Sequence, residues 1–406
     1  KIDFPSKEKT VLLSKILSGI DWELSRNEEQ QIANTSAYIR RKNGLTRSMG
    51  EAHFDTYLSD LEIMGFGVKK EKNHTLIKLP FAETVVKDFY SPLFIDATGT
   101  SDKNTITHIS AISTNNKIIL LGLAMSTTEN SETVTTLLKY VVGDIKVGII
   151  SDEGSAMKAG IASLGDQCSH MFCVWHLSKQ MPNEIILDGI VHINGDAKNI
   201  LYDAARGTAF PYDKFVRALR CDPGLLDKLD RIRSRWCRKY SHTLRRDFIA
   251  TISEALNGTV KRYALDKSQV RLVKAFLQQG MRAYRECCEE SAKLKDNDLM
   301  PLAKRYYDED LEVSEAFFWI QRGNEFDVFY EEMLIAHVIK DENRHYNCDC
   351  GQDRDIGTPC PHILSIEVVK EEDYSHSMWT TNVFKQTFKA PIDITISHKL
   401  PKAIKI

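Results

Sequence analysis

The stretch Ser91-Pro-Leu-Phe-Ile-Asp96-Ala-Thr-Gly-Thr100 decides the fold class that the sequence predicts. Three apolar residues run directly into an acid, and a Thr-Gly-Thr turn follows. A short apolar run that ends in turn residues is typical of a buried strand, so Asp96 is expected just past the end of that strand. The pattern recurs 56 positions later (152 − 96 = 56), where Val-Gly-Ile-Ile-Ser leads into Asp152.

Two acids at the ends of two neighbouring buried strands predict a site for a divalent metal. Mg²⁺ prefers carboxylate oxygens and leaves room for water and for the phosphate of a substrate. The alternative is that Asp96 and Asp152 only cap the helices that follow their strands, as Asp often does. The motifs in the rest of the chain favour the metal site.

The composition is that of an ordinary globular protein of several domains. The 406 residues carry a net charge of −2, so any surface for nucleic acid must be local. No apolar stretch reaches the ~20 residues of a membrane span. The nine cysteines are odd in number and sparse, which favours reduced thiols inside the cell. The chain begins at Lys1 without a methionine, which leaves room for an upstream segment.

Residues 1–85 are predicted to be helical and to end in a hairpin. Apolar residues recur at helical spacing in three segments, and an alternating stretch then turns at Asn73-His74. Three helices and a basic hairpin suggest a winged-helix-like domain that contacts DNA through Lys69, Lys70 and Lys72. The alternative is a plain helical cap on the next domain.

From residue 86 the pattern changes to strand, strand, strand, helix, strand, helix, strand, with the acids after the first and fourth strands. This is the order of an RNase H-like fold, an α/β core with a mixed five-stranded sheet and flanking helices. The acids would lie where that fold holds its metal ions. We assign residues 86–177 to the first part of this core, and we expect Asn130 to cap its first helix.

Residues 178–245 are predicted to be an all-α insertion. They contain seven basic residues in a run without an acid, interleaved with aromatic residues. Such a run can track a phosphate backbone and stack a base, although a solvated helix face is the usual origin of a charge run. The candidate DNA-contacting residues are Arg231, Arg233, Arg235, Trp236, Arg238, Lys239, Arg245 and Arg246.

Residues 246–311 are expected to return to the core and to continue into further helices. In the first of these helices the apolar residues form one buried face, and Glu254 and Asn257 lie elsewhere on the circumference. A helical glutamate beside Asp96 and Asp152 would complete a three-carboxylate metal site. A helical Glu taken alone is usually a surface residue, so the case for Glu254 depends on the other two acids.

The chain's most specific motif lies near the C-terminus. Residues 312–368 contain a strand candidate at 329–338 and then the motif C-x-C-x9-C-x-H. Three thiolates and an imidazole form the closed tetrahedral set of a structural zinc, which leaves no open position for chemistry. The alternative is a set of unmetallated cysteines. The predicted zinc ligands are Cys348, Cys350, Cys360 and His362, and residues 369–406 form a tail.

Taken together, these motifs resemble those of the Mutator-like (MULE) transposases, which are DDE enzymes with an RNase H-like core. Asp96-Ala-Thr-Gly resembles the first acidic motif of that family, and Ile149-Ile-Ser-Asp152-Glu-Gly resembles the second. The terminal Cys/His motif is similar to a SWIM zinc finger, which many of these transposases carry. The resemblance spans about residues 86–392.

Two further segments carry the resemblance. Cys173-Val-Trp-His176 matches the C/D-x-x-H signature of the family, and Ser253-Glu254-Ala-Leu-Asn257 with Lys261-Arg262 resembles the segment of the third acid. We interpret Cys173 and His176 as a core thiol and a site-orienting histidine, with zinc ligation as the alternative. Glu153 is interpreted as a helix-start residue. The gap before the third acid (254 − 152 = 102) implies the helical insertion.

The resemblance implies an activity. Asp96, Asp152 and Glu254 would bind two Mg²⁺ or Mn²⁺ ions at one scissile phosphate, so that the protein cleaves double-stranded DNA at transposon ends and transfers the 3′-hydroxyl ends into a target. It also implies a homodimer that holds two ends, one structural Zn²⁺ ion and a location in the nucleus. One rival is a domesticated DNA-binding regulator of transcription that no longer cuts. An RNA-cleaving RNase H relative is disfavoured by the SWIM finger and the long insertion.

Overall fold

A computed structural model gives the fold, in which the chain has two units, residues 1–54 and 55–406. The first described element is helix α3, which covers Arg47–Ile63. Residues 1–46, which hold most of the predicted N-terminal helices, lie outside the described part. The structure describes residues 47–88, 92–115, 117–182, 184–187, 190–206, 215–219, 222–237, 251–263, 268–295, 300–342, 346–351, 359–366 and 381–388.

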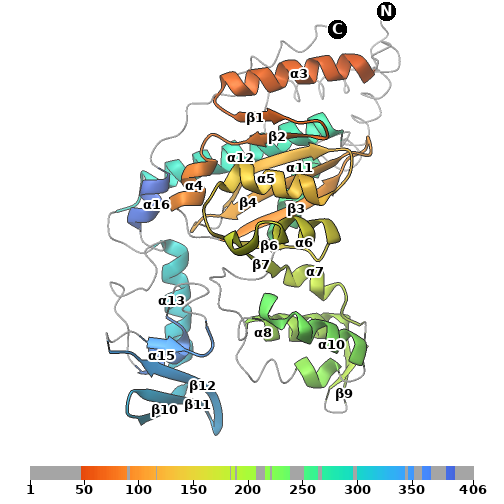
Figure 1. The fold of residues 1–406 in the computed structure, drawn as a ribbon. Helices are drawn as coiled ribbons and strands as arrows, with labels where there is room; N and C mark the ends of the chain where they lie inside the picture. Colours follow the sequence, from red (N-terminus) through yellow and green to blue (C-terminus); the bar gives the residue numbers. More distant parts are fainter. Residues whose placement is uncertain are drawn as a thin grey trace, which may run out of the picture. The chain divides into compact units, whose positions relative to one another are not determined.

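The centre of the second unit is a seven-stranded mixed sheet with the order β1-β2-β5-β4-β3-β6-β7 (Figure 1). Strands β3, β6 and β7 run parallel to one another, and the other neighbours are antiparallel. The predicted succession of three strands, helix, strand, helix and strand is confirmed from β3 onward. The strands are β1 (Gly67–Lys70), β2 (His74–Lys78), β3 (Leu93–Gly99), β4 (Thr105–Ile112), β5 (Ile118–Ser126), β6 (Val147–Ser151) and β7 (Cys168–Phe172).

The sheet has seven strands rather than the predicted five because the basic hairpin belongs to it. Strand β2 pairs with β5, with Leu76 opposite Ala124, so the hairpin is the edge of this sheet. Leu76 and Ile77 are consecutive and both fully buried. Side chains of consecutive strand residues point to opposite faces, so this strand needs cover on both sides, which a free wing does not provide. The predicted boundary at residue 85 therefore falls inside a structural unit.

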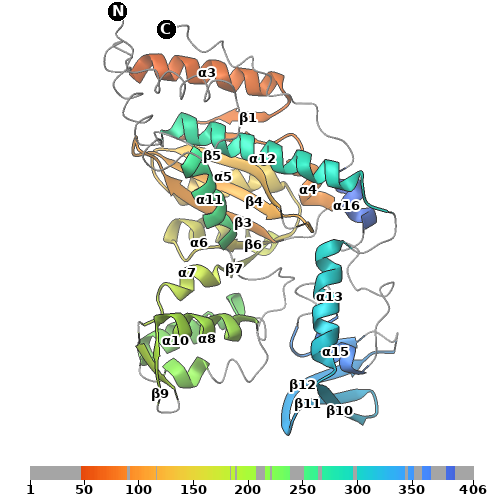
Figure 2. The same cartoon turned by 180° about the vertical axis from the view of Figure 1, so that it is seen from behind.

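Helices cover both faces of the sheet. Helices α5 (Ser131–Val142) and α6 (Ser155–Ala162) lie on the face seen in Figure 1. Helices α11 (Thr251–Tyr263) and α12 (Gln269–Ser291) lie on the opposite face, seen in Figure 2. The predicted cap of α5 is confirmed, because the Asn130 side chain accepts a hydrogen bond from the backbone N–H of Thr133.

Helix α12 approaches the sheet closely at one glycine. A Cβ built on Gly280 would lie 2.8 Å from the Cβ of Leu120 on β5, so only glycine fits between this helix and the strand. Helix α16 (Thr381–Thr387), from the predicted C-terminal tail, packs against α12 and α4 (Ala82–Asp88). Its neighbour Phe388 is buried and its ring lies 5.5 Å from that of Tyr284. Part of the tail thus belongs to the core.

The insertion after β7 is not all-α. The predicted strand through Trp175 ends at Phe172, and helix α7 (Val174–Ser178) begins directly after Cys173. A hairpin of β8 (Glu184–Leu187) and β9 (Ile190–Ile193) follows. Helices α8 (Asn194–Arg206) and α10 (Pro223–Arg231) also belong to this segment, and the 3-10 turn η3 (Arg233–Arg235) comes after α10.

A second, small sheet with the order β10-β11-β12-β13 follows helix α13 (Pro301–Ser314). The single strand predicted at 329–338 is a hairpin, because the chain reverses at Glu331, where φ is 53°. Within the described residues, no helix is long and apolar enough to cross a membrane. The elements of this region are β10 (Phe317–Arg322), β11 (Glu325–Tyr330), β12 (Met333–Lys340), β13 (Tyr346–Cys348) and α15 (Pro361–Ile366).

Candidate functional site

Asp96 lies inside strand β3, not past its end as predicted. The strand continues to Gly99 because Ala97 and Thr98 pair with β4, and Asp96 itself is the register partner of His108. Asp96 is only 7% exposed, and its strand β3 lies in the middle of the sheet between β4 and β6. The backbone N–H of Ala97 donates to Asp96 Oδ1 at 2.8 Å. This acid is therefore held rigidly in the core rather than aimed from a loop.

Asp152 follows strand β6 directly, as predicted. Strands β3 and β6 pair with an offset of 56 residues, because Phe94 lies opposite Ile150 (150 − 94 = 56). By extension of that offset, Asp152, the residue directly after β6, is the counterpart of Asp96 in β3 (152 − 96 = 56). We call Asp96 and Asp152 the carboxylate site.

The Asp152 side chain is oriented by the turn that follows it. The backbone N–H of Gly154 donates to Asp152 Oδ1 at 2.9 Å. A Cβ at position 154 would itself lie 2.9 Å from that oxygen, so a larger residue would displace the carboxylate. Asp152 is half-buried, whereas Asp96 is buried. Access to the carboxylate site from solvent is therefore on the Asp152 side.

Cys173 lies beneath the two acids. Its backbone N–H donates to the carbonyl of Ser151 at 2.7 Å, and its side chain packs in a core cluster with Phe94 and Ile150. Burial, together with the nearby negative charges of Asp96 and Asp152, raises the pKa of the Cys173 thiol to about 12. The thiol is thus neutral and close to both carboxylates, in agreement with its interpretation as a core residue.

A fourth side chain near Asp152 was not predicted. Glu129 precedes the Asn130 cap of α5 and is exposed as a residue. Loss of solvent around its carboxyl group raises its pKa, and the negative charge of Asp152 raises it further. The only signal for it in the sequence is an acid directly before a helix cap, which is too common to be informative.

Helix α11 contributes Asn257 to the carboxylate site. The Asn257 Nδ2 group donates to Asp96 Oδ2 at 2.8 Å, and its Oδ1 lies 3.1 Å from His108 Nε2. Asn257 is 5% exposed, so the expectation that it lies off the buried face of this helix is wrong. Glu254 lies three residues earlier on the same helix, but its side chain is outside the described part. Among the described residues, no third potential ligand joins Asp96 and Asp152 in a preformed metal cluster.

The residues of the C/D-x-x-H signature do not form a metal cluster in the described part of the chain. His176 lies on α7, and its ring meets the edge of Trp175 at a centroid distance of 4.8 Å. Lys179 Nζ lies 3.4 Å from the centroid of the Trp175 ring. The neighbouring acid Glu153 lies before the first residue of α6 and accepts a hydrogen bond from Lys228 Nζ at 2.8 Å. Glu153 thus joins the sheet to helix α10 of the insertion rather than starting a helix.

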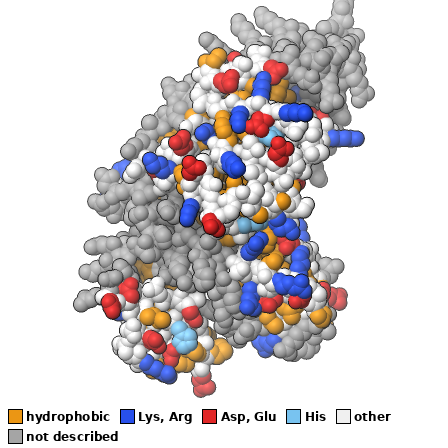
Figure 3. Space-filling view, viewed as in Figure 1, with side chains coloured by type: hydrophobic (Ala, Val, Ile, Leu, Met, Phe, Trp, Pro, Cys, Tyr) orange, Lys and Arg blue, Asp and Glu red, His pale blue; other side chains and the backbone are white. Residues whose placement is uncertain are grey.

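The predicted basic run is only partly described. Figure 3 shows Lys and Arg side chains, with acidic ones among them, over the region of α7 and α10. Arg231 pairs with Asp227, and Arg233 Nη1 lies 3.0 Å from Asp230 Oδ1. The Arg235 guanidinium lies 5.4 Å from the centroid of the Phe172 ring. The remaining predicted residues, which lie outside the described part, are Arg238, Lys239, Arg245 and Arg246.

Trp236 was expected to stack on a base, and the structure corrects this. It is fully buried, its indole Nε1 donates to the carbonyl of Leu229 at 2.8 Å, and its ring meets Phe215 edge-on. It is the centre of a separate hydrophobic core inside the insertion. A large apolar ring in a polar segment was a better indicator of that core than of an exposed contact.

The basic hairpin presents its lysines partly in ion pairs. Lys69 Nζ lies 2.6 Å from Glu71 Oε1, and Lys70 Nζ lies 2.7 Å from Asp55 Oδ1. Lys72 is exposed in the turn between β1 and β2. Exposed pairs of this kind are weak, so all three lysines remain able to contact an anion.

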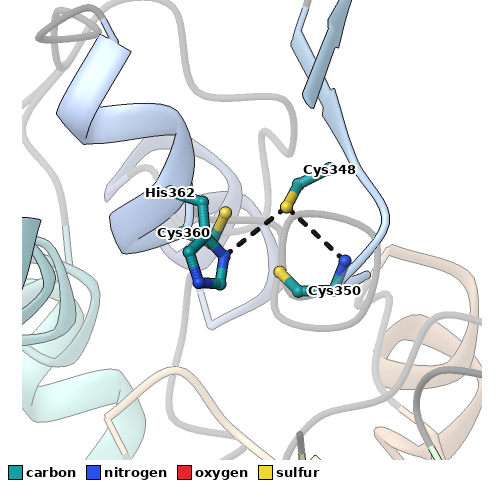
Figure 4. Close-up of side chains that lie close together, drawn as sticks. All are labelled: Cys348, Cys350, Cys360 and His362. Atoms are coloured by element: carbon teal, nitrogen blue, oxygen red, sulfur yellow. Dashed lines mark hydrogen bonds between the residues drawn. The ribbon is translucent and has the colours of Figure 1, made fainter. Parts of the chain in front are cut away.

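The four predicted zinc ligands lie together, as shown in Figure 4. Cys348 ends β13, Cys350 lies in the next turn, and Cys360 and His362 lie at the start of α15. Their ligand atoms are all within 4.8 Å of one another. Cys348 Sγ lies 3.5 Å from His362 Nδ1. We call these residues the Cys3His cluster.

The chemistry of the Cys3His cluster fits zinc. All three cysteines are buried, and their burial raises the pKa of Cys348 and Cys360. Hydrogen bonds from Cys348 and Cys360 hold the pKa of Cys350 well below its usual range, so this thiolate is already favoured. Three thiolates and one imidazole form the closed tetrahedral set of a structural zinc site. The cluster can hold one zinc ion and leaves no position for a substrate.

Comparison of the sequence with protein-family models and with curated proteins finds no match.

Proposed function

We propose that this protein is a metal-dependent DNA transposase of the Mutator-like type, with an RNase H-like core that cuts transposon ends and transfers their 3′-hydroxyl groups into target DNA. The observation that carries this proposal is the parallel pairing of β3 with β6, in which Phe94 lies opposite Ile150, so that Asp96 and Asp152 each follow a paired residue by two positions. Two acids at matching positions beside neighbouring strands are difficult to explain by stability, because like charges in proximity repel.

The residues of the carboxylate site suit divalent ions with oxygen ligands. Asp96 and Asp152 offer hard oxygens of the kind that Mg²⁺ prefers. We propose Asp96, Asp152 and Glu254 as the residues that hold Mg²⁺ or Mn²⁺. Two such ions, when bound, would supply an activated water or 3′-hydroxyl and stabilise the leaving oxygen of one phosphodiester.

Residues of the chain would also position the DNA, contact its phosphates and fold the C-terminal segment. The buried Asp96 is a fixed point, and the half-buried Asp152 faces the side from which a DNA backbone can approach. Basic side chains of the insertion and of the β1–β2 turn would contact the phosphates of double-stranded DNA. The Cys3His cluster, proposed as a SWIM-type finger, would fold the C-terminal segment without joining the reaction. A homodimer would hold the two transposon ends.

The experiment is DNA cutting by the purified chain with Mg²⁺ or Mn²⁺ and a panel of candidate end sequences. Asp152→Asn keeps the shape of the side chain and removes its charge, so we expect cutting and strand transfer to fall at least a thousandfold while folding and DNA binding persist. Asp166→Asn is the matched control, because Asp166 is an exposed acid in the 3-10 turn η1 (Gly165–Gln167) before β7. Parent-like cutting by Asp152→Asn would overturn the proposal. DNA binding by the parent without any cutting would favour the regulator.

A further inference from the structure

We infer that Asn257 is a positioning residue for Asp96 and that His108 fixes the orientation of the Asn257 amide. This inference rests on the proposed function, because Asp96 matters most if it holds a metal ion. The three side chains come from three separate elements, α11, β3 and β4, and they form one chain of hydrogen bonds in the core. Neither His108 nor Asn257 carries a proton or a charge to the substrate.

The chemistry of the three groups allows one arrangement. An ionised carboxylate only accepts hydrogen bonds, so Asn257 must present its amide N–H to Asp96 Oδ2, at 2.8 Å. The Asn257 Oδ1 is then directed to His108 Nε2, at 3.1 Å, and that nitrogen must carry the proton. If Asn257 were reversed, its carbonyl oxygen would face the carboxylate and both would lack a donor. In its Nε2–H tautomer His108 opposes this reversal, because that N–H needs an acceptor.

The environment keeps this arrangement in place. His108 is completely buried, and its ring lies 4.9 Å from that of Phe276 on α12. Burial lowers the pKa of His108 to about 4, so the ring is neutral and one nitrogen remains a donor at physiological pH. Asp96 Oδ1 accepts from the Ala97 N–H, so donors hold both carboxylate oxygens in place.

Donors behind a ligand control how well it binds, and removing one typically weakens metal affinity 10–100-fold. The probe is Mn²⁺ alone, titrated into the zinc-loaded full chain and followed by the paramagnetic resonance signal of free Mn²⁺. We expect Asn257→Ala and His108→Leu to weaken Mn²⁺ binding about 10–100-fold. His108→Gln should restore most of the affinity, because the Gln Nε2 group can replace the ring N–H as donor to Asn257.

Val260→Ala is the matched control. Val260 is buried on the same helix, so its truncation loosens the packing of α11 without touching the hydrogen-bond chain. Parent-like affinity in Val260→Ala, together with loss in Asn257→Ala, supports positioning over general destabilisation. If Asn257→Ala does not fold, the comparison of His108→Leu with His108→Gln decides, because both replace the same buried ring.

The failure of this inference can be told apart from the failure of the proposed function. If Asp96→Asn binds Mn²⁺ like the parent, the carboxylate site is not a metal site and the proposed function falls. If Asp96→Asn loses Mn²⁺ but Asn257→Ala and His108→Leu retain parent affinity, the metal site stands and the positioning role is overturned. Equal losses in His108→Gln and His108→Leu would overturn the donor role of His108.

Discussion

The carboxylate site and the Cys3His cluster are built in opposite ways. All four residues of the cluster lie within a short segment (362 − 348 = 14), and their buried sulfur and nitrogen atoms surround one point. Asp96, Asp152 and Asn257 come from a strand, a turn and a helix spread over 161 residues (257 − 96 = 161), and Asp152 is only half-buried. A closed set of soft ligands suits a structural ion, whereas an open pair of hard ligands suits an ion that must also bind substrate.

The largest effect is expected from breaking the cluster. Structural zinc sites contribute roughly 10 kcal/mol or more of apparent binding energy, and that energy is folding energy for the segment that holds the ion. We expect Cys360→Ser to lose zinc and to speed hydrogen exchange at the backbone amides of β13 and α15. The amides of β3–β7 should stay protected from exchange. Metal analysis and hydrogen exchange of the full chain measure this.

Cys168→Ser is the control for the cluster, because Cys168 is a half-buried thiol at the start of β7, far along the chain from the zinc motif. It should retain the full zinc content. Absence of zinc from the intact protein would contradict the assignment, and the four residues would then contribute only packing contacts.

The contrast between the two regions also explains what could be predicted from sequence. The spacing of Cys348, Cys350, Cys360 and His362 predicted the cluster correctly because its geometry is local. The order of strands and helices from β3 to β7 followed from apolar runs and turn residues, and Asn130 was identified as a cap because its hydrogen bond spans three residues.

Several errors concern contacts between segments distant in the sequence, whereas the β8–β9 hairpin and the reversal at Glu331 are local features that the sequence analysis missed. The extension of β3 beyond Asp96 depends on pairing with β4, and the edge position of the hairpin depends on β5. The local sequence pattern of β3 or of the hairpin does not identify the strand with which it pairs. Trp236 and Asn257 were placed on surfaces because a polar neighbourhood masks a buried residue whose partner lies elsewhere. Tertiary contacts therefore determine these features, which the local sequence pattern does not predict.

An intermediate effect is expected from acid. Burial lowers the pKa of His108 to about 4 from the ordinary 6.5, and burial also lowers that of His170 to about 4. The unfolded chain then binds more protons than the folded one between these values, so stability is full above about pH 6.5 and is lost as the pH falls toward 4. For His108 alone the loss is on the order of 1–3 kcal/mol.

Denaturant unfolding at several pH values tests this effect in the carboxylate region. His108→Gln lacks a titrating ring, so its stability should fall less steeply between pH 6.5 and 4 than that of the parent. Identical slopes in the two proteins would show that His108 does not titrate on unfolding.

The smallest effect is expected at the ion pair between the sheet and the insertion. Lys228 Nζ bonds to Glu153 Oε2 at 2.8 Å and to Gln180 Oε1 at 2.6 Å, but the lysine side chain is 48% exposed. Partly exposed pairs contribute about 0.2–1 kcal/mol, so Lys228→Met should lower the unfolding free energy by no more than that. High salt should weaken the parent and leave the variant unchanged. A loss of several kcal/mol would show that this pair is a principal support of the insertion.

The central claim is that Asp96 and Asp152 share divalent ions, and the most direct measurement is the position of Mn²⁺ bound to crystals of the protein, located by its anomalous scattering. The account predicts a peak within ligand distance, about 2.0–2.4 Å, of carboxylate oxygens from both residues. It also predicts loss of that peak in Asp152→Asn. A peak that avoids both acids, or no peak at saturating Mn²⁺, would contradict it.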